Sequence, residues 1–221
     1  MKGRFMALAS AAAVCLVGAA FAPAASLAQD PILFVHGYTE SASVWNTMIG
    51  RFEKDGYAKS ALSAYSYNTS QSNKVDAEEV KSRVETLLKN NAGATKVDIV
   101  AHSMGSLNTR YYIKNLGGEA KVDDWVSLGG PNHGTEFANF CTSTSCIEMR
   151  IGSTFLKELN ATDETPGAVH YGTWWSPCDE IINPDSSVAL SGATNTETAC
   201  ISHSALMSDE TVYKQVREFV K

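Results

Sequence analysis

Short apolar runs alternate with amphipathic stretches along most of the chain. Continuous apolar runs predict strands buried on both faces, whereas apolar residues at helical spacing predict helices with one face in the core. The predicted strands cover residues 31–35, 62–67, 96–101, 122–128, 168–175 and 199–202. The predicted helices cover residues 44–52, with Ser43 as the cap, 75–89, a segment ending at residue 116, and 208–221. Strands that alternate with helices predict an α/β fold with a mostly parallel sheet of about six strands covered on both faces.

The first 28 residues have a different pattern. Lys2 and Arg4 precede an apolar run that ends in the small-residue sequence of residues 26–28, which predicts a secretory signal peptide cleaved after Ala28. A membrane anchor is the alternative, but it needs about 20 apolar residues, and Gly18 and Pro23 shorten this run. We therefore expect a mature chain of residues 29–221 that forms a single catalytic domain.

Composition and charge narrow the class of protein. Hydrophobic residues make up 44% of the chain and charged residues 19%, which is typical of a globular protein. Loss of Lys2 and Arg4 leaves 16 basic against 24 acidic residues, a formal charge of −8, which argues against nucleic-acid binding. No second apolar run approaches membrane-spanning length. We expect an exported monomer, extracellular or periplasmic, without an integral membrane segment.

The cysteine count predicts disulfides. Cys15 leaves with the signal peptide, so four cysteines remain, and an even number in an exported chain indicates bridges. Of the three possible pairings, the short polar insert favours Cys141–Cys146, which leaves Cys178–Cys200. A zinc site is the alternative, but the chain has no C-x-x-C pair with a nearby histidine partner.

Residues 101–105, with the sequence AHSMG, lie between a predicted strand and a predicted helix. A serine hydroxyl that acts as a nucleophile must protrude from a tight strand-to-helix turn, and small residues are needed two positions before and after it. Ala101 and Gly105 meet that need on either side of Ser103. The pattern differs from G-x-S-x-G at Ala101, yet its setting predicts that Ser103 is a nucleophile.

Further segments accompany the AHSMG elbow: His36, Gly37 and Tyr38 at the end of the first predicted strand, residues 128–135, Asp179 after a predicted strand, and His203 in a late loop. Together these segments resemble the α/β-hydrolases, and in particular the small, nearly lidless lipases secreted by bacilli and related bacterial lipases and esterases. The resemblance covers the whole mature chain, and those small lipases also have Ala at the first position of the elbow. It implies an α/β-hydrolase fold with a minimal lid or none, and a triad in the order Ser, acid, His.

The base is assigned from this resemblance. His203, in a loop before the last predicted helix, occupies the family's base position, and a lone surface histidine is the alternative interpretation. The other histidines fit less well: His36 precedes the nucleophile and supports the first strand end, His102 is the variable elbow residue pointing away from Ser103, His133 lies in the loop after the next strand, and His170 begins a strand where a core histidine is expected.

The predicted acid is Asp179, which follows a predicted strand at the edge of the sheet where catalytic groups gather. Its carboxylate would orient His203 and stabilise the imidazolium. The alternatives, with capping or solvation as their ordinary roles, are Glu180, expected to face elsewhere, Asp163 and Asp185. The favoured bridge Cys178–Cys200 adjoins both the acid and the base, so we expect it to clamp their loops.

The fold implies that backbone N–H groups of Tyr38 and Met104 form the oxyanion hole, with Gly37 allowing close approach. The Tyr38 side chain could also shape the acyl pocket, and both roles stay open. An apolar rim would favour a lipase over an esterase, with core packing as its alternative role. The candidates for that rim are Trp45, Tyr38, Ile147, Met149 and Ile151.

The predicted function is therefore a secreted serine ester hydrolase, and the resemblance favours a triacylglycerol lipase that contacts a lipid–water interface transiently. A short-chain carboxylesterase, a hydrolase of polyester, thioester or amide bonds, and a non-catalytic binding protein are the alternatives. No phosphate loop, dinucleotide fingerprint or zinc motif is present, so we predict no cofactor and no metal. Calcium is the alternative that stays open, although no acidic loop has calcium-ligand spacing.

Overall fold

The computed structural model describes Met1 and residues 29–220. The predicted signal peptide, its cleavage site and Cys15 lie outside the described residues, apart from Met1.

The described chain contains a six-stranded sheet in the order β2-β1-β3-β4-β5-β6. Every pair of neighbouring strands is parallel, so each strand is joined to the next by a crossover connection. The observed sheet confirms the predicted fold class. The strands are β1 (Ile32–Val35), β2 (Leu62–Ala64), β3 (Val97–His102), β4 (Val122–Leu128), β5 (His170–Trp175) and β6 (Thr194–Glu197).

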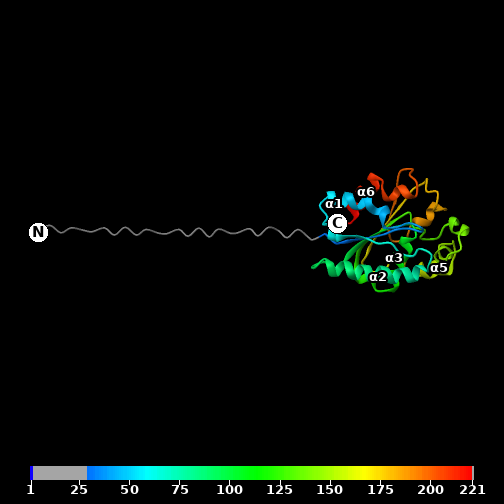
Figure 1. Cartoon of the computed structure of the whole chain (residues 1–221), viewed down its shortest axis with the longest axis horizontal. Coiled ribbons are helices and arrows are strands. Elements are labelled where there is room, and N and C mark those ends of the chain that lie inside the picture. Colours follow the sequence, from blue (N-terminus) through cyan, green and yellow to red (C-terminus); the bar gives the residue numbers. More distant parts are fainter. Residues whose placement is uncertain (2–28, 221) are drawn as a thin grey trace.

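Helices cover both faces of the sheet (Figure 1), with α1 and α6 on one face and α2 and α3 on the other. The α-helices are α1 (Asn46–Lys54), α2 (Asn73–Asn90), α3 (Gly105–Asn115), α4 (Thr144–Glu148), α5 (Thr154–Leu159) and α6 (Glu210–Phe219). Short 3-10 helices lie at Ala42–Trp45, Lys59–Ala61, Gly118–Ala120, Glu136–Phe140, Asp185–Val188 and Ser204–Met207.

Strand β1 shows why a continuous apolar run marks a central strand. Ile32 and Phe34 face α1 and α6, whereas Leu33 and Val35 face α2 and α3. All four side chains are fully buried. Burying one such side chain contributes roughly 1.5–3 kcal/mol, so both faces of the strand must be apolar.

The longest connection, between β4 and β5, forms a third apolar cluster against α3. Phe155 and Leu156 of α5 and Met149 pack on Met104 and Leu107, and all are buried. Sequence analysis predicted no helix in this connection and therefore missed α4 and α5. Both helices are too short for their apolar spacing to be distinguished from a loop.

The strand expected at residues 199–202 is wrong. The last strand is β6, Thr194–Glu197, a polar edge strand that hydropathy does not reveal. Residues 199–202 form a loop instead, because the Ser176 hydroxyl accepts a hydrogen bond from Ile201 N–H at 3.0 Å and lies 2.6 Å from the Ile201 carbonyl oxygen.

Two smaller expectations also fail. Ser43 does not cap a helix, because it lies inside the 3-10 helix Ala42–Trp45, and its hydroxyl pairs with that of Ser41 at 2.9 Å. Strand β2 ends at Ala64 rather than at residue 67. Beyond it, the Tyr67 hydroxyl donates to the His36 carbonyl oxygen at 2.6 Å, so this segment braces the end of β1 rather than extending the sheet.

Candidate active site

Ser103 lies at a sharp turn between β3 and α3, as the elbow pattern predicts. Its φ angle is +51°, a left-handed conformation that costs a residue with a side chain roughly 1 kcal/mol or more. The surrounding sheet holds it there, since Ser103 N–H donates to the Leu128 carbonyl oxygen at 2.9 Å. The turn directs this side chain to the carboxyl end of the sheet, where parallel α/β folds bind ligands.

The small residues around Ser103 are required by close backbone approach. A Cβ atom on Gly105 would lie 2.6 Å from the Val35 carbonyl oxygen, and one on Gly37 would lie 2.8 Å from Cβ of Ser103. Ala101 is fully buried beneath the turn. Strand β1, the loop after it and the elbow therefore meet at distances that larger side chains would prevent.

His203 and Asp179 form a buried pair beside this turn. His203 Nδ1 donates to Asp179 Oδ2 at 2.8 Å, and their side chains are 9% and 1% exposed. The other carboxylate oxygen of Asp179 accepts hydrogen bonds from the N–H groups of Ile181 and Ile182, both at 2.9 Å. A carboxylate with this many donors is held in one orientation, and it fixes the tautomer of the imidazole.

The pair is electrostatically suited to a base and its orienting acid. Burial disfavours ionisation of Asp179, but the hydrogen bond and charge of His203 and the two backbone donors outweigh it and lower the pKa of Asp179. Burial and the neighbouring His102 lower the pKa of His203 below its ordinary value, although Asp179 opposes them. At neutral pH His203 is therefore uncharged and able to accept a proton.

Ser103 and His203 line the same pocket, whose volume is about 200 Å³. Its other lining residues are Tyr38, Thr39, Glu40, Thr135, Phe137, Met149, Ile181 and Ile182. The apolar side chains in this set favour an acyl chain.

The proposed oxyanion donors lie on either side of Ser103. Met104 follows it directly, and Tyr38 follows Gly37, at which an added Cβ atom would lie 2.8 Å from Cβ of Ser103. Within the described part of the chain, neither N–H donates to a protein acceptor. The Tyr38 hydroxyl pairs with the hydroxyl of Ser143 at 3.0 Å, so this side chain also joins the pocket wall to α4.

Residues 128–135, which carried part of the resemblance, support the Asp179–His203 pair. A Cβ atom on Gly129 would lie 3.0 Å from His203 Nδ1 and 3.1 Å from Asp179 Oδ2, so a larger residue would separate the pair. The Thr135 hydroxyl donates to the Ile181 carbonyl oxygen at 2.5 Å. This loop therefore sets the position of the acid.

Both favoured disulfides are present. Cys178–Cys200 joins the loop of Asp179 to that of His203, with Cα atoms 4.9 Å apart. Cys141–Cys146 joins the segment before α4 to α4 itself. Cys178–Cys200 is therefore the bridge between the two loops that the sequence predicted.

The remaining histidines have other partners. His36 is buried and stacks on Tyr67, consistent with support of the loop after β1. His133 Nε2 pairs with Glu164 at 2.7 Å, outside the pocket. His170 was expected in the core, but its side chain is 72% exposed, because it begins β5 at the open amino edge of the sheet, where it pairs with Asp124.

Two carboxylates that sequence analysis did not place in the site belong to it. Glu40 accepts from Gly37 N–H at 2.7 Å and from His102 Nδ1 at 3.0 Å. Glu180 was expected to face away from the site, and this expectation is wrong. Its Oε2 accepts a hydrogen bond from His203 N–H at 3.0 Å. No periodicity or motif distinguishes either residue from a solvated loop carboxylate.

The other alternative acids lie in local turns. Asp163 accepts from Thr165 N–H at 2.9 Å, and Asp185 accepts from Ser186 N–H at 2.9 Å. Both contacts are the ordinary capping role of aspartate in loops.

The expected apolar rim is partly wrong. Trp45 is fully buried in the core against Phe34, because the 3-10 helix before α1 turns it inward. Met149 is buried but lines the pocket, and Tyr38, which is half-buried, also lines it. The exposed apolar side chains of the β4–β5 connection are Ile147, Ile151, Phe137 and Phe140, and sequence analysis missed the two phenylalanines.

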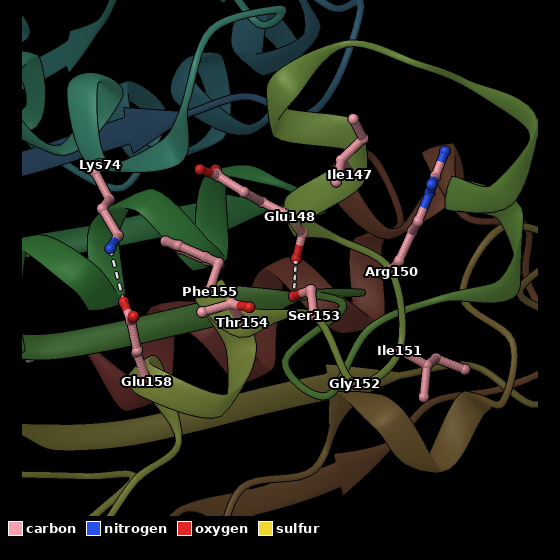
Figure 2. Close-up of a pocket in the computed structure, with 10 residues that line it drawn as sticks. All are labelled: Lys74, Ile147, Glu148, Arg150, Ile151, Gly152, Ser153, Thr154, Phe155 and Glu158. Carbon is pink, nitrogen blue, oxygen red and sulfur yellow. Dashed lines mark hydrogen bonds and ion pairs between the residues drawn. The ribbon is translucent and has the colours of Figure 1, made fainter.

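A second, wider groove of about 540 Å³ lies beyond α4 (Figure 2), lined by Ile147, Ile151 and Phe155 among others. The charged side chains Lys74, Glu148 and Glu158 in its lining join the β4–β5 connection to α2. Lys74 pairs with Glu158 at 2.7 Å, and Glu148 accepts from Asn73 N–H at 2.7 Å. The groove therefore extends the apolar surface without adding reactive groups.

One cluster has the residue types of a metal site. Asp123, Asp124 and His170 each place a ligand atom within 4.8 Å of the others at the amino edge of the sheet. Lys96 already pairs with Asp123 at 2.6 Å, which supplies a positive charge there. This cluster lies at the opposite edge from Ser103.

The fold and this pocket define an α/β-hydrolase. The family model of class 2 lipases matches residues 29–220, and the chain belongs to that family. It is a carboxylic ester hydrolase, as the resemblance implied.

Solved structures share the fold. Mature lipase BlEst2 of Bacillus licheniformis is 18% identical with a TM-score of 0.77, covering 89% of this chain and 94% of that one. Aspergillus fumigatus lipase B is 16% identical with a TM-score of 0.69, covering 84% and 51%. A Listeria innocua gene product is 15% identical with a TM-score of 0.67, covering 87% and 94%. Among the described residues, no helix is both long and apolar enough to cross a membrane.

Proposed function

We propose that the protein is a secreted triacylglycerol lipase in which Ser103 is the nucleophile, His203 the base and Asp179 the residue that orients the base. The observation that carries the proposal is the buried Asp179–His203 pair, 2.8 Å long, whose histidine lines the same pocket as Ser103, a serine held at φ +51°. The lipase family supports the lipid substrate. Residues 29–221 form the catalytic domain after the signal peptide is removed.

In the acylation step, Ser103 Oγ forms a bond to the ester carbonyl carbon while its proton passes to His203 Nε2. The carbonyl π electrons move to oxygen, and the N–H groups of Tyr38 and Met104 stabilise this oxyanion. When the intermediate collapses, the ester C–O bond breaks and the leaving alcohol takes the proton from His203. Asp179 stabilises the transient imidazolium through its 2.8 Å hydrogen bond.

In the deacylation step, water replaces the alcohol. His203 accepts a water proton as the hydroxyl oxygen bonds to the acyl carbon, and then returns it to Ser103 Oγ as the acyl–serine bond breaks. The fatty acid leaves and the resting enzyme is restored. No redox group or metal takes part in this sequence.

The exposed side chains Phe137, Phe140, Ile147 and Ile151 favour a lipase over a soluble-ester esterase. Phe137 lines the pocket and is 44% exposed, and Phe140 nearby in the chain is 86% exposed. Apolar side chains beside a pocket lose water when they contact an oil surface, and each buried Å² contributes roughly 25 cal/mol. They would place the pocket mouth at the interface where triacylglycerol lies.

The test compares initial rates on emulsified long-chain triacylglycerol and on a soluble short-chain ester for the wild type and for Ser103→Ala. The proposal of a lipase is supported if the wild type hydrolyses both substrates and Ser103→Ala hydrolyses neither. Activity on the soluble ester alone makes the protein a carboxylesterase. If Ser103→Ala keeps the wild-type rate on either substrate, the proposed nucleophile is wrong.

A second comparison isolates the apolar side chains. Phe140→Ser should lower the rate on the emulsion several-fold and leave the soluble-ester rate unchanged, because it removes only interfacial contact. Val75→Ser is the matched control, since Val75 is an exposed apolar residue on α2, 53% exposed, that does not line the pocket. Equal loss on both substrates would argue against an interfacial role for Phe140.

A further inference from the structure

A carboxylate that the proposed triad does not use lies in the pocket wall. Glu40, in the loop after β1, lines the pocket beside Ser103, and its side chain is 21% exposed. A single oxygen, Oε2, accepts from Gly37 N–H at 2.7 Å and from His102 Nδ1 at 3.0 Å. This one oxygen therefore connects Gly37, which precedes Tyr38 in the loop after β1, to His102, which precedes Ser103.

His102 in turn contacts His203. Its side chain is 1% exposed, its Nε2 lies 3.2 Å from the His203 backbone oxygen, and the two ring centroids are 4.5 Å apart. Because the ring is packed between Glu40 and His203, it cannot shift without moving one of them. The connection thus runs from the loop after β1 to the backbone of the proposed base.

His203 is held from the other side as well. Glu180 accepts its N–H at 3.0 Å, and Asp179 accepts its Nδ1–H at 2.8 Å. The backbone N–H, the backbone oxygen and the ring of His203 each contact a different residue. Of these three contacts, only the one through His102 leads to the loop that carries Tyr38.

Glu40 is ionised in this setting. Burial disfavours its charge, but the hydrogen bond and charge of His102 and the Gly37 N–H outweigh burial and lower the pKa of Glu40. A hydrogen bond to an ionised acceptor is about twice as strong as one between neutral groups. Both contacts of Oε2 are therefore suited to hold a fixed geometry.

We propose that Glu40 is a positioning residue that sets the distance between the oxyanion-binding N–H of Tyr38 and the base His203, through Gly37 on one side and His102 on the other. The inference rests on the proposed function, since it has meaning only where Ser103 attacks and His203 accepts the proton. The donors and the base must be held to about 0.5 Å for the transition state to gain from both. Ground-state binding of the substrate makes no such demand.

The test uses Glu40→Ala and Glu40→Gln in the full-length exported protein, with Glu136→Gln as the matched control. Glu136 is an exposed carboxylate that contacts Asn183 and does not line the pocket. Enzyme concentrations come from titration with a fluorophosphonate. The quantities measured are kcat and KM for a soluble p-nitrophenyl ester, and the Ki of a trifluoromethyl ketone that mimics the tetrahedral intermediate.

We expect Glu40→Ala to lower kcat about 10- to 100-fold and to weaken the trifluoromethyl ketone by a similar factor, with KM changed less than about threefold. Glu40→Gln keeps an oxygen for the Gly37 N–H, so it should recover part of the loss. Glu136→Gln should match the wild type. A merely structural role would lower the melting temperature without the parallel change in kcat and Ki.

Wild-type kcat and Ki in both Glu40 variants would overturn the inference. If Glu40→Ala does not fold, Glu40→Gln decides alone, and wild-type values in that variant overturn it. Ser103→Ala separates this failure from failure of the proposed function. Loss of activity in Ser103→Ala with unchanged Glu40 variants rejects only the role of Glu40, whereas an active Ser103→Ala rejects the proposed function itself.

Discussion

Two aspartate–histidine pairs lie at opposite edges of the same parallel sheet. Asp179 and His203 are 2.8 Å apart at the carboxyl edge, and Asp124 and His170 are 3.0 Å apart at the amino edge. The first pair is almost completely buried, whereas the His170 side chain is 72% exposed. The residue types and distances are nearly the same, so neither explains why one pair is suited to catalysis.

The surroundings make the difference. An exposed ion pair contributes about 0–1 kcal/mol, because water screens its charges. In the buried pair, His203 lines the same pocket as the strained Ser103, and Asp179 accepts two backbone N–H groups. A disulfide joins the loops of both residues. A reactive pair therefore needs desolvation and a neighbouring nucleophile, which the carboxyl ends of parallel strands supply and the amino ends do not.

The sharpest test of this comparison replaces the two acids in turn. Asp179→Asn should lower kcat by about 10⁴-fold, because an amide N–H₂ facing Nδ1 favours the wrong tautomer of His203. Asp124→Asn, the matched change at the amino edge, should leave kcat within about twofold. Both are measured on a soluble ester with titrated enzyme. Similar losses in the two variants would mean that the pairs do not differ in function.

The second test removes the disulfide that distinguishes the carboxyl edge. Cys178–Cys200 spans 22 residues and Cys141–Cys146 spans 5, so chain entropy predicts losses of roughly 3 and 2 kcal/mol in the free energy of unfolding. The Cys178→Ser, Cys200→Ser double variant should also lose kcat, because its bridge joins the loops of Asp179 and His203. Urea unfolding and kinetics measure the two effects. Full activity and an unchanged free energy of unfolding in this double variant would refute the clamp.

A third test uses pH. A base acts when it is unprotonated, and burial together with His102 lowers the pKa of His203, so the acid limb of kcat/KM should have its midpoint below 6.5. Below that midpoint the rate should fall about tenfold for each pH unit. Asp124→Asn should not move the limb, because His170 takes no part in the reaction. A midpoint above 6.5 would contradict the assigned environment of His203.

The smallest effect is expected at the amino edge. Asp98 is buried there, and its Oδ2 has no hydrogen-bond partner among the described residues. Burial and Asp124 raise the pKa of Asp98 well above its ordinary value. The folded state thus binds this proton more tightly than the unfolded state, so the stability it adds is present at acid pH and is lost as pH rises through the folded pKa.

Asp98→Asn should therefore stabilise the protein at pH 7 by of order 1 kcal/mol, with little change at pH 4 and no change in kcat. Urea unfolding at the two pH values measures the difference. Equal destabilisation at both values would contradict the raised pKa of Asp98, because an effect caused by ionisation must differ between the two pH values. The expected result contrasts with that for Asp179, where we expect loss of the carboxylate to lower kcat.

Local sequence was informative wherever one segment carried its own signal. Strand β4 has the predicted bounds, and α2 begins and ends within two residues of expectation. The first ends in the apolar-rich stretch Trp125–Leu128, and the second keeps its apolar residues at helical spacing. The AHSMG elbow was recognisable for the same reason, since strand, turn and helix are consecutive. Strand β6 was missed because an exposed edge strand needs no apolar residues.

The amino-acid sequence by itself determined the parallel α/β sheet, the elbow around Ser103 and the family to which the chain belongs. Only the tertiary structure decided that Glu40 and Glu180 contact the proposed site, and that Trp45 lies in the core instead of at the rim. The reason is that periodicity and motifs report contacts between residues near in sequence. Which loop carboxylates are desolvated depends on how separate loops meet at the end of the sheet.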